Sequence, residues 1–189
     1  MRLPETPPAS AGGARRVGPV LGLTRSFIRL WAWGFGGLLL VGIVLMTAYS
    51  ATANFFFSRP LPGDFEIVQI GVAIAAFAFL PLAQLTRANV VVDIFTQWAG
   101  AGAKRAMELL GSLAAIAFAV LLLWRMSDGM LDYYRYSEYT AIIGIPIWAA
   151  FPPILFSLFL LLIAALITAA ETLGLVERTP DAGLPGGAE

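Results

Sequence analysis

The sequence predicts an all-α integral membrane protein with four transmembrane helices, and three observations support this fold class. The first is composition: hydrophobic residues make up 59% of the 189-residue chain and charged residues 13%, with a mean hydropathy of +0.80. A soluble domain carries about 25% charged residues, so much of this surface must face something other than water. The other two observations are the length of the apolar stretches and the distribution of lysine and arginine.

Four apolar stretches are long enough to cross a bilayer, which takes roughly 20 residues in a helix. None of them carries a charged residue near its middle. Segments with several prolines and glycines precede the first stretch and follow the last, and we expect 1–23 and 175–189 to be disordered cytoplasmic tails. The predicted membrane domain is therefore 24–174, with spans at about 33–57, 65–85, 107–124 and 148–170.

Basic residues predict the orientation of the spans, because short cytoplasmic loops carry an excess of lysine and arginine. Several arginines precede the first span, and three basic residues lie between the second and third spans, whereas Arg59 alone lies between the first and second. Both termini are accordingly predicted to be inside the cell. The side chains expected to anchor the chain at the lipid headgroups are Arg25, Arg29, Trp31, Trp33 and Arg87.

The connection between the second and third spans has an amphipathic pattern. Ile94, Phe95 and Trp98 recur with helical spacing on one face, and Asp93 and Gln97 lie on the other. This pattern predicts a short interfacial helix along the inner membrane surface. The helix is either a simple connector or a contact surface for another membrane subunit.

Local signals indicate where three of the helices begin or end. Asp64 follows a turn that contains proline and glycine, and we expect it to cap the second helix, with Glu66 beside the positive end of the helix dipole. Charged residues at helical spacing follow the third span, so this helix should continue to near Tyr134. We expect the Pro152–Pro153 pair to bend or restart the fourth helix.

The residue types that are missing exclude several function classes. The chain has no cysteine and no histidine, which removes disulfides, thiolate or imidazole metal sites and Ser-His catalysis. The net charge of zero gives no indication of nucleic-acid binding. We therefore predict no catalytic residue, no metal site and no cofactor on this chain.

One polar line runs along the first span. Thr47, Ser50 and Asn54 are spaced by three and four residues and therefore lie on one helical face. Such side chains form hydrogen bonds across helix interfaces in membranes. The alternative, a path for a solute, is less favoured because no ionisable residue lies near the middle of a span.

The order of three short motifs resembles one family. These are Leu-Pro-Gly-Asp-Phe-Glu at 61–66, Asn-Val-Val-Val-Asp at 89–93, and Gly-Ile-Pro-Ile-Trp at 144–148, which is followed by two further prolines. With the four spans, they resemble the small membrane subunit, or Q subunit (DctQ-like), of tripartite ATP-independent periplasmic (TRAP) transporters. Asn89 departs from the pattern at a position where the family frequently has histidine.

The resemblance implies two protein partners and a location. A large M subunit carries the sodium and solute sites, and a soluble periplasmic binding protein captures small organic acids. The Q subunit is expected to be a non-catalytic scaffold beside the M subunit in a bacterial or archaeal cytoplasmic membrane, with lipids as its other contacts. Sodium is then expected on the partner M subunit and not on this chain.

Two groups of residues are candidates for contact with these partners. The exposed charged and aromatic residues of the outer loops are candidates for docking the binding protein, and the polar line and the interfacial helix are candidates for the M-subunit interface. The alternatives are a structural or assembly subunit of another membrane complex and, less favoured, a membrane enzyme or redox anchor. The docking candidates are Arg59, Asp64, Arg135, Tyr136 and Glu138, and the interface candidates are Thr47, Ser50, Asn54, Asp93, Phe95 and Trp98.

Overall fold

The computed structural model describes residues 19–86 and 101–174, and within these ranges it is helical and has no strand. Four stretches there are long and apolar enough to cross a membrane, which confirms the predicted all-α class. In chain order the elements are α1 (Pro19–Leu30), the π-helical segment η1 (Trp31–Gly36), α2 (Gly37–Phe57), α3 (Asp64–Leu85), α5 (Ala101–Arg135), the 3-10 turn η2 (Ile147–Ala150) and α6 (Phe151–Thr172).

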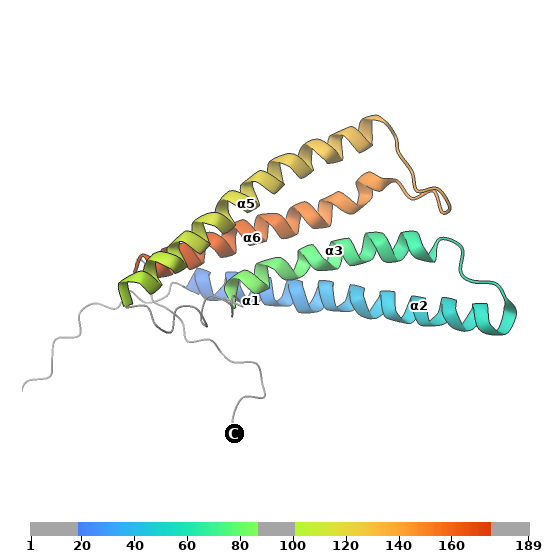
Figure 1. Ribbon diagram of the computed structural model, residues 1–189, viewed down its shortest axis with the longest axis horizontal. Coiled ribbons are helices and arrows are strands. Elements are labelled where there is room, and N and C mark those ends of the chain that lie inside the picture. The colour runs from blue at the N-terminus through green and yellow to red at the C-terminus, as the bar shows by residue number, and fades with distance from the viewer. Residues whose placement is uncertain (1–18, 87–100, 175–189) are drawn as a thin grey trace, which may run out of the picture.

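The four long helices lie side by side in the order α2, α3, α6, α5 (Figure 1). Extensive packing joins α6 to both α3 and α5, and α2 lies against α3. The starts of α1 and α5 and the end of α6 lie at one end of this layer, which we call the terminal end. The opposite end carries the connections at 58–63 and 136–146, and we call it the loop end (Figure 1). This arrangement is what four traversals require, and the side of the membrane that each end faces stays a prediction.

α6 is the centre of the layer because it has a neighbour on each side. Leu158 and Ala164 are fully buried, and Leu158 packs with the equally buried Ala119 of α5. At the edge of the layer, α2 buries only Ile43 and Ser50 among its own residues. Small side chains at the contacts allow helices to approach closely, which is how helices associate in lipid.

The first helix starts earlier than the sequence predicts. Helix begins at Pro19 and continues through η1 and α2 to Phe57, whereas the prediction placed 19–23 in a tail and began the span near Trp33. The extension has a packing reason: Ile28 is fully buried against Leu160 and Ala164 of α6. A search for apolar runs finds the membrane span but does not detect an amphipathic turn that packs on a neighbouring helix.

Among the other described helices, α2 ends at Phe57 and α3 covers Asp64–Leu85, whereas α5 begins at Ala101, before the predicted span at 107–124. α5 extends to Arg135, as the charge spacing near Tyr134 indicates, and α6 begins with the Pro152–Pro153 pair in its first turn. Proline fits this position because the first amides of a helix have no partner within it. The predicted interfacial helix and the greater part of the two predicted tails lie outside the described residues.

Candidate interaction sites

The Ser50 side chain of α2 forms hydrogen bonds with the α2–α3 connection and with the start of α3. This side chain is 2% exposed, and its hydroxyl donates to the Asp64 carboxylate at 2.6 Å and accepts the backbone N–H of Leu61 at 3.1 Å. The sequence predicted that Asp64 caps α3, and this prediction was wrong. The N-cap is Gly63, and Asp64 is the first residue of the helix. Both polar side chains are therefore used to join two consecutive helices.

Glu66 connects α3 to the α5–α6 connection. Its two carboxylate oxygens accept the backbone N–H groups of Ile142 at 2.8 Å and Ile143 at 3.1 Å. Beside this contact, Ile143 lies over Gly63, where a Cβ would come within 2.0 Å of the Ile143 side chain. Gly63 also has a φ of +74°, so both the space and the backbone conformation require glycine at this position.

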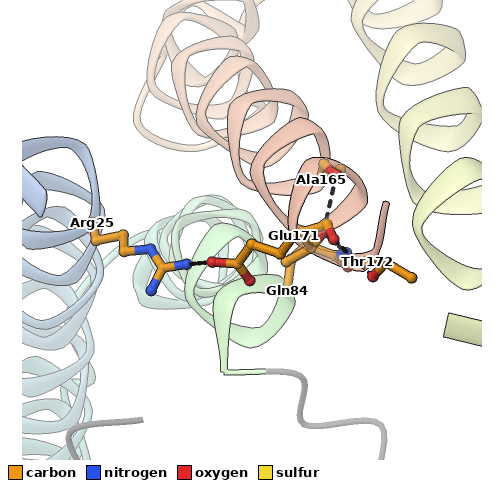
Figure 2. A network of polar contacts seen from close by, with 6 residues as sticks. Arg25, Gln84, Ala165, Glu171 and Thr172 are labelled. Atoms are coloured by element: carbon orange, nitrogen blue, oxygen red, sulfur yellow. Dashed lines mark hydrogen bonds and ion pairs between the residues drawn. The ribbon is translucent and has the colours of Figure 1, made fainter. Parts of the chain in front are cut away.

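At the terminal end, polar side chains join α1, α3 and α6. Arg25 of α1 forms an ion pair with Glu171 of α6, whose side chain is 5% exposed. Gln84 of α3 donates to the hydroxyl of Thr168 at 3.1 Å. Figure 2 shows Arg25 and Gln84 approaching the last turns of α6 from two different helices. These contacts fix three helices at one level of the layer.

The π-helical segment directs Trp31 toward α6. The indole N–H of Trp31 donates to the hydroxyl of Ser157 at 3.1 Å, and its ring stacks on Phe35 with centroids 4.4 Å apart. The Trp31 ring also contacts Phe156 in a T-shaped arrangement, with centroids 4.6 Å apart. A π-helical insertion changes the direction in which side chains leave a helix, and here it accompanies a tryptophan that bonds within the chain.

The predicted lipid anchors thus divide into two groups. Arg25 and Trp31 make internal contacts with α6, as described above. Arg29 and Trp33 are exposed on α1 and η1, and the Trp33 ring also contacts Phe79 of α3 at a centroid distance of 6.1 Å. Arg87 lies outside the described residues, and lipid contact stays a prediction for all five.

The polar line of α2 is not one surface. Ser50 faces α3, whereas Thr47 is exposed and its hydroxyl donates to the carbonyl of Ile43 in its own helix at 2.8 Å. Asn54 is exposed near the loop end. Thr47 and Asn54 thus remain on the outside of the layer, and the other interface candidates, Asp93, Phe95 and Trp98, lie outside the described residues.

The docking candidates all lie at the loop end, on both of its connections. Arg59 is exposed after α2, and Arg135, Tyr136 and Glu138 are exposed where α5 leads into the next connection. Asp64 is half-buried and bonded to Ser50. The structure thus brings these residues to one end of the layer, and their docking role stays a prediction. The sequence did not identify Asp64 as an internal contact.

Sequence reasoning missed the partners of Glu66 and Glu171. Glu66 and the amide of Ile142 are 76 residues apart in the chain, and Arg25 and Glu171 are 146 residues apart. Acidic residues near helix ends are common because of the helix dipole, so neither glutamate carried a distinctive local signal. In the described part of the chain, no group of three or more His, Cys, Asp or Glu residues is arranged to hold a metal ion.

Large apolar side chains are exposed along both edge helices. On α2 they include Leu38, Val44 and Leu45, at 65 to 73% exposure. On α5, Leu110 and Trp124 are each 66% exposed. In water such a surface would be an aggregation site or an interface, and along helices of this length it is the surface of a protein embedded in lipid or in a membrane complex.

A multi-pass helical membrane protein is the class that this fold and its apolar edges define. A protein-family model described as the DctQ component of tripartite ATP-independent periplasmic transporters matches residues 43–174, which is more than half of the 189-residue chain. The chain belongs to this family, and the resemblance seen in the three motifs is confirmed. The comparisons with curated proteins and with solved structures gave no match.

Proposed function

We propose that this chain is the small permease subunit of a sodium-coupled TRAP transporter for organic acids. In this proposal it is a non-catalytic scaffold beside the large M subunit, and it helps to dock the periplasmic solute-binding protein. The observation that carries the proposal is the family match, which extends from Ile43 in α2 to the end of α6. Sodium and solute bind the M subunit and not this chain.

The contacts within the layer support a scaffold role. The polar contacts described above join one helix to another or to a connection, at both ends of the layer. In the described spans, the Asp, Glu, Lys and Arg residues lie before η1, in the first turn of α3, in the last turn of α6 or toward either end of α5. A chain that moves ions by itself usually places such groups near the midplane, so these positions fit a rigid partner better than a carrier.

The distribution of basic residues supports an orientation with the terminal end in the cytoplasm of a bacterial or archaeal cell. The loop end then faces the periplasm, where Arg59, Arg135, Tyr136 and Glu138 are exposed and accessible to a soluble protein. We keep the M-subunit interface on the exposed side of α2, at Thr47 and Asn54, and on the predicted interfacial helix.

A pull-down of the tagged chain from its native membrane in a gentle detergent tests this proposal. Mass spectrometry of the bound proteins should identify a large polytopic TRAP subunit in near-equal amount. Recovery of a different membrane complex would instead favour the alternative, a structural or assembly subunit of another system.

The predicted interfacial helix provides a sharper variant of the same experiment. Trp98→Ala should lower recovery of the large subunit, because buried aromatic residues dominate many interfaces. Trp124→Ala is the matched control, since this tryptophan is 66% exposed on α5 and is not among the interface candidates. Equal recovery with both variants would remove Trp98 from the interface.

A further inference from the structure

Helices α2 and α3 form one hairpin, and α5 and α6 form a second. The two hairpins diverge toward the loop end, where the α5–α6 connection approaches the start of α3 (Figure 1). The contact is a carboxylate on two amides: Glu66 accepts from Ile142 and Ile143, which are 76 and 77 residues away in the chain. Hydrogen bonds to an ionised acceptor are stronger than neutral ones. The contact therefore links the hairpins at a level where their helices have separated.

The connection is folded so that these two amides are available. Tyr139 and Pro146 form an isolated antiparallel bridge, and the amide of Thr140 donates to the carbonyl of Ile145 at 2.9 Å. The amide of Ile145 in turn donates to the Thr140 hydroxyl at 3.0 Å. The connection thus satisfies other amides internally and presents those of its tip to Glu66.

Apolar packing beside the carboxylate makes the contact specific. Ile143 fits over Gly63, and the glycine leaves the space that this side chain occupies. Gly63 directly precedes α3, and Glu66 is in the first turn of that helix. The start of α3 therefore contacts the tip of the connection in two ways: Gly63 leaves space for Ile143, and the Glu66 carboxylate accepts hydrogen bonds from the tip amides.

We infer that Glu66 is a positioning residue that latches the α5–α6 connection to α3. The latch fixes the exposed residues at the base of this connection, Tyr136 and Glu138, relative to the α2–α3 connection that carries Arg59. A soluble binding protein then meets a preformed surface made by both hairpins, which reduces the ordering cost of docking. This last step rests on the proposed function, whereas the latch itself does not.

Spin-label distances test the latch directly. The chain has no cysteine, so a Thr52→Cys and Ala141→Cys pair places one label on the rigid α2 and one on the tip of the connection. With Glu66 present we expect one narrow distance distribution. Glu66→Ala should raise the displaced population by at least about threefold, because two charge-assisted bonds are lost. A distribution unchanged in Glu66→Ala would overturn the inference.

Two further variants keep the experiment decisive. Glu66→Gln retains the shape and one acceptor oxygen without the charge, and it should give an intermediate population; it also replaces Glu66→Ala if that variant does not fold. Asp132→Asn removes an exposed carboxylate at the loop end of α5 and should leave the distances unchanged. A shift as large in Asp132→Asn as in Glu66→Ala would show a general charge effect and overturn the latch.

The affinity of the purified complex for its binding protein tests the positioning step. Glu66→Ala should raise the dissociation constant by the factor by which the latched fraction, measured with the spin labels, falls relative to wild type, while recovery of the large subunit stays unchanged. Displaced labels with unaltered affinity would overturn the positioning role. Absence of any large subunit in the wild-type preparation would refute the proposed function instead, and the label distances would still decide whether the latch exists.

Discussion

The two ends of the helical layer are held together in different ways. At the terminal end, side chains of three helices bond to one another directly, through Arg25 with Glu171 and Gln84 with Thr168. At the loop end the hairpins meet through a connection, and the carboxylate of Glu66 bonds to backbone amides. The terminal end therefore depends on pairs of side chains, and the loop end depends on the conformation of the backbone.

This difference predicts which substitutions each end tolerates. A side-chain pair can be replaced by another pair of complementary shape, as long as no charge is left buried alone. A contact that depends on a glycine with positive φ and on free amides allows much less change. For each atom altered, substitutions at the loop end should accordingly lower the free energy of unfolding more than substitutions at the terminal end.

Gly63→Ala should have the largest effect. Its Cβ would come within 2.0 Å of Ile143, and φ is +74°. Strain and overpacking together correspond to about 2–5 kcal/mol, visible as a lower midpoint of thermal unfolding in mild detergent. Gly42→Ala is the matched control, because its Cβ would meet nothing within 4 Å. Equal midpoints for the two variants would contradict the glycine requirement.

Arg25→Ala should have the next largest effect, at the terminal end. It leaves Glu171 buried without the arginine, and because Arg25 is itself 24% exposed we expect a loss of about 1–3 kcal/mol. Replacing both residues by methionine should restore most of the stability, since no single charge then remains. The exposed Arg29 is the control, and Arg29→Ala should leave the unfolding midpoint unchanged. A double variant as unstable as Arg25→Ala would show that the charge imbalance is not the cause.

Ser50→Ala should have the smallest of these effects. It removes the hydroxyl that bonds to Asp64 and to the amide of Leu61, at a cost of about 1–2 kcal/mol. Thr52→Ala, at an exposed residue whose hydroxyl bonds to its own helix, should change the unfolding midpoint little. If both variants behave alike, Ser50 does not hold the α2–α3 connection.

The sequence predicted the fold class and most of the helix positions because these depend on local composition. The apolar runs located the spans, and the charges spaced along the end of α5 predicted its extension to Arg135. The start of α1 could not be predicted in this way, because Ile28 is buried by residues of α6 that are distant in sequence. An amphipathic turn next to a proline-rich segment resembles a tail until its partner is known.

The candidate site was predictable only as a location. The charged and aromatic residues of the connections are exposed at the loop end, as expected. The direction of Ser50 could not be predicted, because three polar residues on one helical face give no indication of which one meets a neighbouring helix. The contact between Glu66 and Ile142 depends on the packing of two hairpins, and a single sequence carries no local sign of it.

In our proposal this chain functions as one subunit of a TRAP transporter, and the mass of the intact complex checks that claim. Native mass spectrometry of the tagged chain in mild detergent should show a species heavier than 20.2 kDa by the mass of one large polytopic subunit. Collisional activation should then release the two chains separately. A spectrum that contains only the 20.2 kDa chain or its multiples would contradict the claim.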